Sequence, residues 1–198
     1  MIELETPHGP ARAHVNEAEE PVAVLVLGHG AGGGVGAPDL KAATEAALAV
    51  NVTTILVEQP YRVAGRKSAA PAAQLDTAWV SVLEQLAIDG PVYVGGRSSG
   101  ARVACRTSAA VNATGVLCLA FPLHPPGRPE KTRLPELEQV TVPVLIVQGE
   151  SDPFGMPPDA PNRRVVRLKG NHSLKSDVRG LRAAVTAFLS GGNDGDVD

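Results

Sequence analysis

Residues 96–100 constrain the fold more than any other part of this chain. They form the pentapeptide Gly-Arg-Ser-Ser-Gly, directly after an apolar run, residues 91–95, that is typical of a buried strand. Gly-x-Ser-x-Gly in this position predicts a sharp strand-to-helix turn, because glycine lacks the Cβ atom that would clash where the backbone reverses. Such a turn lifts a serine hydroxyl out of the sheet, so Ser98 is the candidate nucleophile.

An activated serine needs a base that takes its proton and an acid that orients the base, and in this context the acid precedes the base in the chain. A second apolar strand, residues 142–148, runs into a turn-forming cluster that contains Asp152. A short strand, residues 164–168, is followed by a polar loop that contains His172. The sequence therefore predicts Ser98, Asp152 and His172 as a catalytic triad.

Two of the triad residues, Ser98 and Asp152, also have a structural interpretation. A serine between glycines can belong to a tight turn only, and Asp152 can cap the turn before Pro153. Glu150 is the next candidate for the acid, whereas Asp177 lies in the first turn of the expected last helix, where acidic groups favour the helix dipole. The order of serine, acid and base, each after a strand, favours the catalytic interpretation.

A glycine-rich loop supplies the fourth part of the predicted site. An apolar strand, residues 22–27, is followed by Gly28-His29-Gly30-Ala31-Gly32-Gly33, whose backbone N–H groups can face developing negative charge. We expect the oxyanion hole to be formed by the N–H of Ser99 and by the N–H of Ala31 or of a neighbour in this loop. The residues expected to contact the substrate or to orient the loops around it are Gly30, Gly32, His29, Arg97 and His124.

Several basic residues near this site have two interpretations. Arg97 and Arg102 flank the nucleophile and either could bind a substrate carboxylate, although Arg102 could equally pair with a neighbouring acid. Arg62, Arg66 and Lys67 lie in the loop of residues 58–67, where a solvated surface is favoured over attraction of an anionic substrate.

Strands and helices alternate along the chain. Strands are expected at residues 2–5, 11–15, 22–27, 53–57, 91–95, 115–120, 142–148 and 164–168, and helices at residues 39–50 and 72–87, after Ser98 and at the end of the domain. The expected helix of residues 72–87 carries one apolar stripe, formed by Leu75, Ala78, Trp79, Val82, Leu83 and Leu86. The buried strands are continuously apolar. This pattern predicts an α/β fold with a mostly parallel, doubly wound sheet and helices on both faces. We expect one domain over residues 1–190 and a disordered acidic tail over residues 191–198. The loop of residues 121–130 is too short to fold as a cap domain.

Composition excludes several classes of function. The formal charge is −3 and only 3% of the residues are aromatic, which argues against nucleic-acid binding. No apolar run approaches the length of a membrane span, and the N-terminus lacks an export signal. The two cysteines, Cys105 and Cys118, have neither disulfide nor metal spacing, so we expect a cytoplasmic protein with no cofactor and no metal.

Four phrases carry a resemblance to a known family, namely residues 95–104, 121–127, 142–149 and 152–155. The chain resembles the α/β-hydrolase superfamily, and within it the small lidless branch near the dienelactone hydrolases. Over residues 22–189 it is most similar to the hydrolase-like domain of the testis-expressed and NSL-complex subunit proteins. The resemblance implies a single-domain α/β-hydrolase fold without a cap domain, and a triad of Ser98, Asp152 and His172. Dienelactone hydrolases use a cysteine nucleophile, so Ser98 argues against their particular substrate.

These observations predict a serine hydrolase that cleaves an ester or similar acyl bond of a small substrate through an acyl-enzyme. The expected partner is a small-molecule acyl substrate, and the expected state is a monomer or homodimer. Some members of the closer group serve as complex subunits, so a non-catalytic scaffold is one alternative. Acyl transfer, thioester cleavage or peptide cleavage on the same triad is the other.

Overall fold

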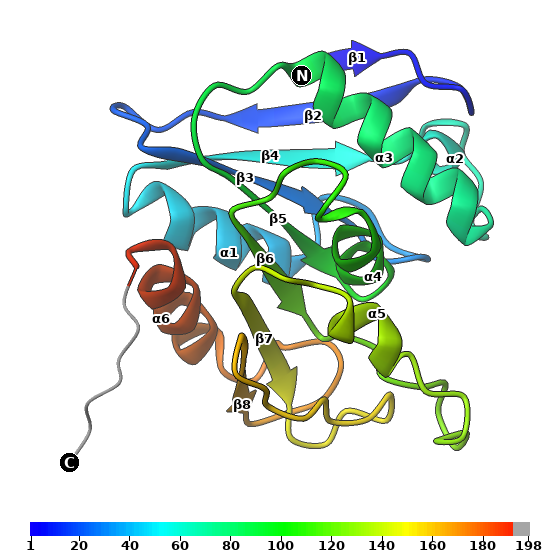
Figure 1. Ribbon diagram of the computed structural model, residues 1–198, viewed down its shortest axis with the longest axis vertical. Helices are drawn as coiled ribbons and strands as arrows, with labels where there is room; N and C mark the ends of the chain where they lie inside the picture. The colour runs from blue at the N-terminus through cyan, green and yellow to red at the C-terminus, as the bar shows by residue number, and fades with distance from the viewer. Residues whose placement is uncertain (192–198) are drawn as a thin grey trace.

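The computed structural model describes residues 1–191 and contains one eight-stranded sheet with helices on both faces (Figure 1). The order of the strands across the sheet is β1-β2-β4-β3-β5-β6-β7-β8. The strands are β1 (Ile2–Leu4), β2 (Ala11–Asn16), β3 (Ala23–Gly28), β4 (Val52–Glu58), β5 (Val92–Arg97), β6 (Gly115–Leu119), β7 (Val144–Gly149) and β8 (Arg163–Leu168). The helices are α1 (Pro38–Leu48), α2 (Pro60–Val63), α3 (Ala72–Leu86), α4 (Ser99–Thr107), α5 (Leu134–Glu138) and α6 (Val178–Leu189).

Strands β3 to β8 are all parallel, whereas β1 and β2 join the edge as an antiparallel pair, with β2 also antiparallel to β4. The parallel order places the carboxyl ends of β3, β5, β7 and β8 at one edge of the sheet. The predicted triad residues and the glycine-rich loop follow these four strands, and His124 follows the neighbouring parallel strand β6, so the topology gathers them at that edge.

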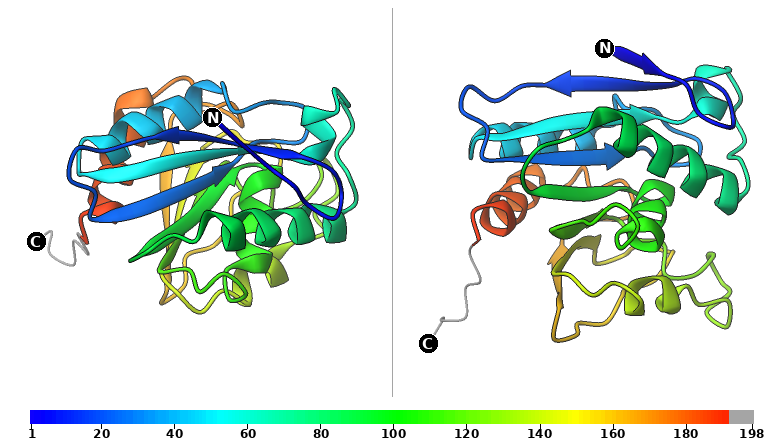
Figure 2. Two further views of the ribbon diagram at one scale, coloured as in Figure 1. Left: turned by 90° about the horizontal axis from the view of Figure 1, so that it is seen from above. Right: turned by 45° about the horizontal axis from the view of Figure 1, so that its top comes forward.

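Alternate residues of the central strands belong to two separate hydrophobic clusters. In β6, Val116 and Cys118 face the cluster that contains α3, α4 and α5, whereas Leu117 and Leu119 face the cluster that contains α1 and α6. Figure 2 shows these two layers of helices on opposite faces of the twisted sheet. Burial on both faces explains why these strands read as continuous apolar runs rather than alternating ones.

The sequence located every strand and the four longer helices. The apolar stripe expected in α3 is confirmed, because Leu75, Ala78, Trp79, Val82 and Leu83 are buried. The short helices α2 and α5 were not predicted, since one turn of helix leaves no periodic pattern. The expected disorder of the tail concerns residues that, apart from Gly191, lie outside those that the structure describes.

Within residues 1–191, no helix has the length and apolar character needed to cross a membrane. The connection between β6 and β7 contains only the five-residue helix α5, so the fold has no cap domain over the carboxyl edge of the sheet.

Candidate active site

Ser98 lies at the sharp turn between β5 and α4. Its backbone has φ 52° and ψ −109°, a conformation that a residue with a side chain rarely adopts. The Ser98 N–H donates to the carbonyl of Leu119 on the neighbouring strand at 2.9 Å, which anchors the turn to the sheet. This geometry presents the hydroxyl of Ser98 at the carboxyl edge.

Two glycines make the turn possible because the chain passes extremely close to β3. A Cβ atom added to Gly96 would lie 2.5 Å from the carbonyl oxygen of Gly28, and one added to Gly100 would lie 2.4 Å from the same oxygen. Both obstacles are backbone atoms, which cannot rotate away as a flexible side chain can. The pattern Gly-x-Ser-x-Gly is therefore a steric requirement of this turn.

The structure brings Ser98, His172 and Asp152 together from three separate loops. The Nε2 atom of His172 lies 3.0 Å from the Ser98 hydroxyl oxygen, and its Nδ1 atom lies 2.8 Å from Oδ2 of Asp152. A carboxylate can only accept, so His172 carries a proton on Nδ1, and Nε2 of the neutral ring is left to accept from the hydroxyl. The three side chains thus form a continuous line of hydrogen bonds.

Asp152 is held in place by two further donors. Its Oδ2 accepts from the side-chain amide of Gln148 at 2.9 Å, and its Oδ1 accepts from the N–H of Phe154 at 2.9 Å. The same amide nitrogen of Gln148 is within hydrogen-bonding distance of the carbonyls of Phe121 and Gly155. The side chain of Asp152 is 1% exposed, so its orientation is fixed by protein groups rather than by solvent.

His172 is oriented by packing as well as by hydrogen bonds. Its ring lies against that of Phe154, with centroids 4.3 Å apart and an interplanar angle of 33°. Its side chain is 17% exposed, which leaves one edge of the imidazole open to a reactant. Its backbone carbonyl accepts from the guanidinium of Arg97 at 3.2 Å.

The glycine-rich loop after β3 lies beside the nucleophile. A Cβ atom added to Gly30 would lie 3.7 Å from the Cβ of Ser98. The hydroxyl of Tyr61 donates to the carbonyl of Ala31 at 2.8 Å and ties this loop to α2. Within the part of the chain that the structure describes, the N–H groups of Ala31 and Ser99 have no hydrogen-bond acceptor. Both are free to receive an anionic oxygen.

His29 orients the backbone of the glycine loop, one of the two roles expected for it. It is 3% exposed and both ring nitrogens are used by the backbone, with Nδ1 2.8 Å from the carbonyl of Gly30 and Nε2 accepting from the N–H of Gln59 at 3.1 Å. These two contacts fix the proton on Nδ1. His29 therefore connects the glycine loop to the end of β4 and has no polar atom left for a ligand.

The other residues that were expected to contact the substrate differ in their exposure and in their contacts. Gly32 is exposed, with open space around its Cα. His124 is half-buried beside Gly155, and its Nδ1 lies 2.9 Å from the carbonyl of Pro125. The guanidinium of Arg97 contacts the carboxylate of Asp39 and the backbone carbonyl of His172. Arg102 forms a two-pronged ion pair with Glu136 at 2.8 and 2.6 Å, which agrees with the structural interpretation of that residue.

Four residues that organise the site were not singled out from the sequence, namely Gln148, Phe154, Tyr61 and Asp39. Gln148 had a visible signal, because it is a polar residue at the end of an apolar strand and four residues before the candidate acid. Phe154, Tyr61 and Asp39 contact segments that are distant in the chain, and no local sequence pattern indicates such contacts.

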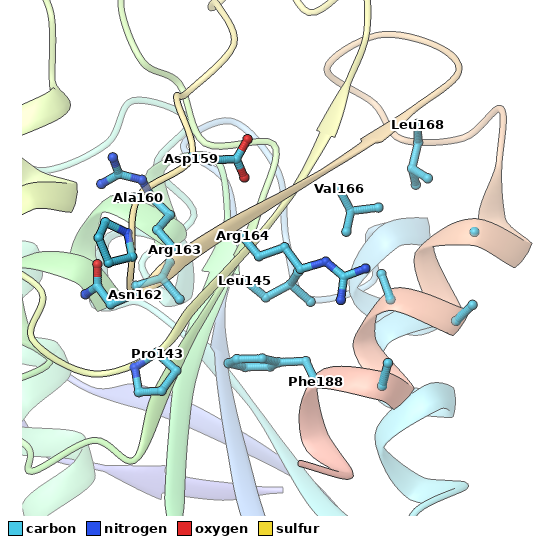
Figure 3. A pocket seen from close by; sticks show the side chains of 16 residues that line it. Pro143, Leu145, Asp159, Ala160, Asn162, Arg163, Arg164, Val166, Leu168 and Phe188 are labelled. Carbon is cyan, nitrogen blue, oxygen red and sulfur yellow. The ribbon is translucent and has the colours of Figure 1, made fainter. Parts of the chain in front are cut away.

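The largest cavity described does not belong to this site. It has a volume of about 600 Å³ and runs along the edge strand β8 and helix α6, where Arg164, Val166 and Phe188 line it (Figure 3). None of the triad residues lines this cavity. A reactant at Ser98 would instead occupy the open surface above the carboxyl edge of the sheet.

The arrangement contains the groups that nucleophilic catalysis by a serine requires. It contains a serine beside a base, a base beside a buried acid, and two free N–H groups near the nucleophile. Among residues 1–191, no group of three or more histidine, cysteine or acidic side chains is placed to hold a metal ion.

Comparisons with known proteins agree with this architecture. Residues 21–180 match the family model described as an alpha/beta hydrolase domain. No curated protein sequence matches the chain.

Several solved structures are similar over nearly the whole chain. One is an α/β serine hydrolase without lid from Xanthomonas campestris, with 18% identity, 96% of this chain and 93% of that chain covered, and a TM-score of 0.80. Another is Est1E from Butyrivibrio proteoclasticus with bound ferulic acid, with 16% identity, coverage of 97% and 99%, and a TM-score of 0.77. A dienelactone hydrolase from Anabaena variabilis has 15% identity, coverage of 96% and 94%, and a TM-score of 0.72. At these identities the similarity establishes the fold.

Proposed function

Because the chain belongs to the alpha/beta hydrolase domain family and is a hydrolase, we propose that it is a serine hydrolase that cleaves an ester bond of a small substrate. The proposed catalytic residues are Ser98 as nucleophile, His172 as general base and Asp152 as the orienting acid. The observation that carries the proposal is the unbroken line of hydrogen bonds from Ser98 through His172 to Asp152.

In the proposed mechanism, Nε2 of His172 takes the proton of Ser98 as the hydroxyl oxygen attacks the acyl carbonyl. The carbonyl oxygen becomes negatively charged and accepts from the N–H groups of Ala31 and Ser99. The protonated imidazole then gives its proton to the leaving alcohol, and an acyl group remains on Ser98. Water enters, His172 takes a proton from it, and the acyl-enzyme is hydrolysed by the same steps.

Two features support a small and accessible substrate. The fold has no cap domain, so the reactant meets an open surface at the carboxyl edge. The side chain of His172 is 17% exposed and Ser98 is half-buried, so neither residue is sealed from solvent. Among the structural relatives, Est1E binds ferulic acid, which supports a carboxylic acid as the acyl part.

The proposal is tested by turnover of p-nitrophenyl esters of increasing acyl length, from acetate upward, with the wild-type protein and Ser98→Ala. We expect turnover of the short esters and its loss by a factor of about 10³ or more in Ser98→Ala. Undiminished turnover in that variant would show that another group acts as nucleophile. A scaffold function predicts no turnover of any ester by the folded wild-type protein.

A further inference from the structure

Arg97 is the residue immediately before the nucleophile, and its side chain contacts three separate segments of the chain. Its Nε lies 2.8 Å from Oδ2 of Asp39 in α1, and its Nη2 donates to the backbone carbonyl of His172 at 3.2 Å. Its Nη1 approaches the glycine loop, since a Cβ atom added to Gly30 would lie 3.0 Å from it. The guanidinium therefore lies where the loops of nucleophile, base and candidate oxyanion hole meet.

Asp39 holds Arg97 from below. Its side chain is 0% exposed, and its Oδ1 accepts from the N–H of Leu40 at 3.0 Å, so the carboxylate is fixed to the first turn of α1. The Nε–H of Arg97 is not aligned with Oδ2 for a good hydrogen bond, so the contact is mainly electrostatic. Burial raises the pKa of Asp39, and the charge of Arg97 and the N–H of Leu40 oppose that rise. A carboxylate so placed costs free energy to ionise and is poorly explained by stability alone.

The glycine at position 30 makes this arrangement possible. The Gly30 Cα has no side chain, and the space that a Cβ would fill is bounded by Nη1 of Arg97 and the Cβ of Ser98. A larger residue would press the guanidinium away from the loop that carries His172. The contact between the glycine loop and the turn at Ser98 thus depends on both Gly30 and Arg97.

We propose that Arg97, anchored by the buried carboxylate of Asp39, is a positioning residue that fixes the His172 loop against the nucleophile turn. The inference rests on the proposed function, because it assigns how the base of that same triad is placed. It replaces the expectation that Arg97 binds a substrate carboxylate. The planar fork of arginine can reach Asp39 and the His172 carbonyl at once, whereas the single ammonium of lysine cannot duplicate both contacts.

The test compares Arg97→Met, Arg97→Lys and Asp39→Asn with the wild-type protein in two assays. The first is the rate constant for labelling of Ser98 by a neutral fluorophosphonate probe. The second is kcat and KM for two p-nitrophenyl esters, one neutral and one with a carboxylate on its acyl group. Thermal unfolding is recorded for each variant, so that loss of folded protein is separated from loss of reactivity.

Arg102→Met is the matched control. Arg102 is an arginine of the same segment with a similar exposed fraction, 26% against 23% for Arg97, and it also loses an ion pair with a carboxylate. Its partner Glu136 lies on α5, where it accepts from Arg102 and Arg106. We expect Arg102→Met to lower the unfolding temperature and to leave the labelling rate unchanged.

For Arg97→Met and Asp39→Asn we expect labelling about 10- to 100-fold slower, because a small displacement of the base removes its alignment with the nucleophile. Arg97→Lys should retain an intermediate rate. The loss should appear in kcat and be equal for the two esters, with KM little changed. Asp39 is buried and cannot touch a substrate, so a loss in Asp39→Asn can only act through Arg97 and the segments that it joins.

Two results would overturn the inference while leaving the triad in place. One is wild-type labelling rates in folded Arg97→Met and Arg97→Lys. The other is a loss confined to KM of the carboxylate ester, which would make Arg97 a substrate ligand. Failure of the proposed function has a different signature, since the folded wild-type protein would then not be labelled at all.

Discussion

The orientation of Asp152, the candidate acid of the triad, depends on its neighbours. The carboxylate accepts from Gln148, from the N–H of Phe154 and from His172, and it is almost completely buried. Because the first two donors fix the direction of Oδ2, the ring of His172 can present Nε2 to Ser98 in one orientation only. The sequence favoured Asp152 as the acid and left Glu150 as the next candidate. In the structure it is Asp152 that accepts from Gln148 and contacts His172.

We predict that Asp152→Asn lowers kcat for a short ester by a factor of about 10³ to 10⁴, because an amide N–H in place of Oδ2 favours the wrong tautomer of His172. Glu150→Gln is the control. Glu150 is exposed and lies two residues before Asp152. We expect Glu150→Gln to retain the wild-type kcat. Steady-state kinetics of both variants decide between the two carboxylates, and a large loss in Glu150→Gln alone would contradict the assignment of Asp152.

His29 provides a test that depends on pH. Burial lowers the pKa of His29 from its usual 6.5, while the carbonyl of Gly30 and the charge of Glu58 partly oppose this effect and Arg62 adds to it. Between the folded and unfolded pKa values the unfolded chain binds more protons, so the free energy of unfolding falls as the pH drops below about 6.5. The contribution of His29 is present above that pH and is lost as the pH falls through the lower, folded pKa.

We therefore predict a shallower pH dependence of stability in His29→Asn than in the wild-type protein. The variant should be less stable at pH 8, because the links from this side chain to Gly30 and Gln59 are lost, and the difference should shrink toward pH 5. Urea unfolding across this range measures it. Parallel curves for the two proteins would show that His29 does not titrate differently in the folded state.

The turn between β5 and α4 is an element whose sequence is dictated by packing. Gly96 and Gly100 both lie against the carbonyl of Gly28, and Ser98 adopts a positive φ between them. The strain is tolerated because Ser98 N–H bonds to Leu119 on β6 and α4 continues directly from the turn. The position of the nucleophile is consequently fixed by the sheet.

We predict that Gly96→Ala lowers the free energy of unfolding by about 1–3 kcal/mol or more, since the new methyl group meets backbone on both β3 and α4. Gly36→Ala is the control, because a Cβ there meets nothing within 4 Å and its φ lies outside the left-handed region. That variant should be unchanged or slightly more stable. Urea unfolding of the pair measures the difference, and equal stabilities would contradict the steric account of the turn.

Periodic apolar patterns predicted the long helices and strands, whereas contacts between distant segments of the chain could not be predicted. Strand β6 and helix α3 were both located within one residue of their observed ends because burial imposes a regular apolar pattern on each. Helix α5 has five residues and no period of its own. The pairing of Arg97 with Asp39 and the stacking of Phe154 on His172 join residues far apart in the chain, which a single sequence cannot reveal.

For the molecule as a whole, the order of the strands explains why a few short motifs predicted so much of the site. Parallel strands align their carboxyl ends, so residues after β3, β5, β7 and β8 must meet at one edge. The parallel order of the strands therefore brings Ser98, Asp152 and His172 together, although each is only a weak signal in the sequence. This order does not fix which loop groups face a substrate, and the contacts of His29 and Arg97 with other segments became visible only in the structure.

The largest cavity described lies away from the candidate active site. That cavity follows β8 and α6, whereas the hydrogen-bonded triad lies on an open surface. At the carboxyl edge, in contrast, the candidate nucleophile, the candidate base and two N–H groups without an acceptor lie together. We therefore propose that this edge is distinguished by the reactivity of one serine, Ser98.

The most direct test of that claim is labelling of the purified protein with a fluorophosphonate probe, with the labelled residue mapped by mass spectrometry. We expect covalent label on Ser98 in the wild-type protein and in Ser68→Ala, an exposed serine in a surface loop. We expect no label on residue 98 in Ser98→Ala and a loss of labelling in His172→Ala. A folded wild-type protein that takes up no label, or label that persists in both of those variants, would contradict the assignment of Ser98 as an activated nucleophile.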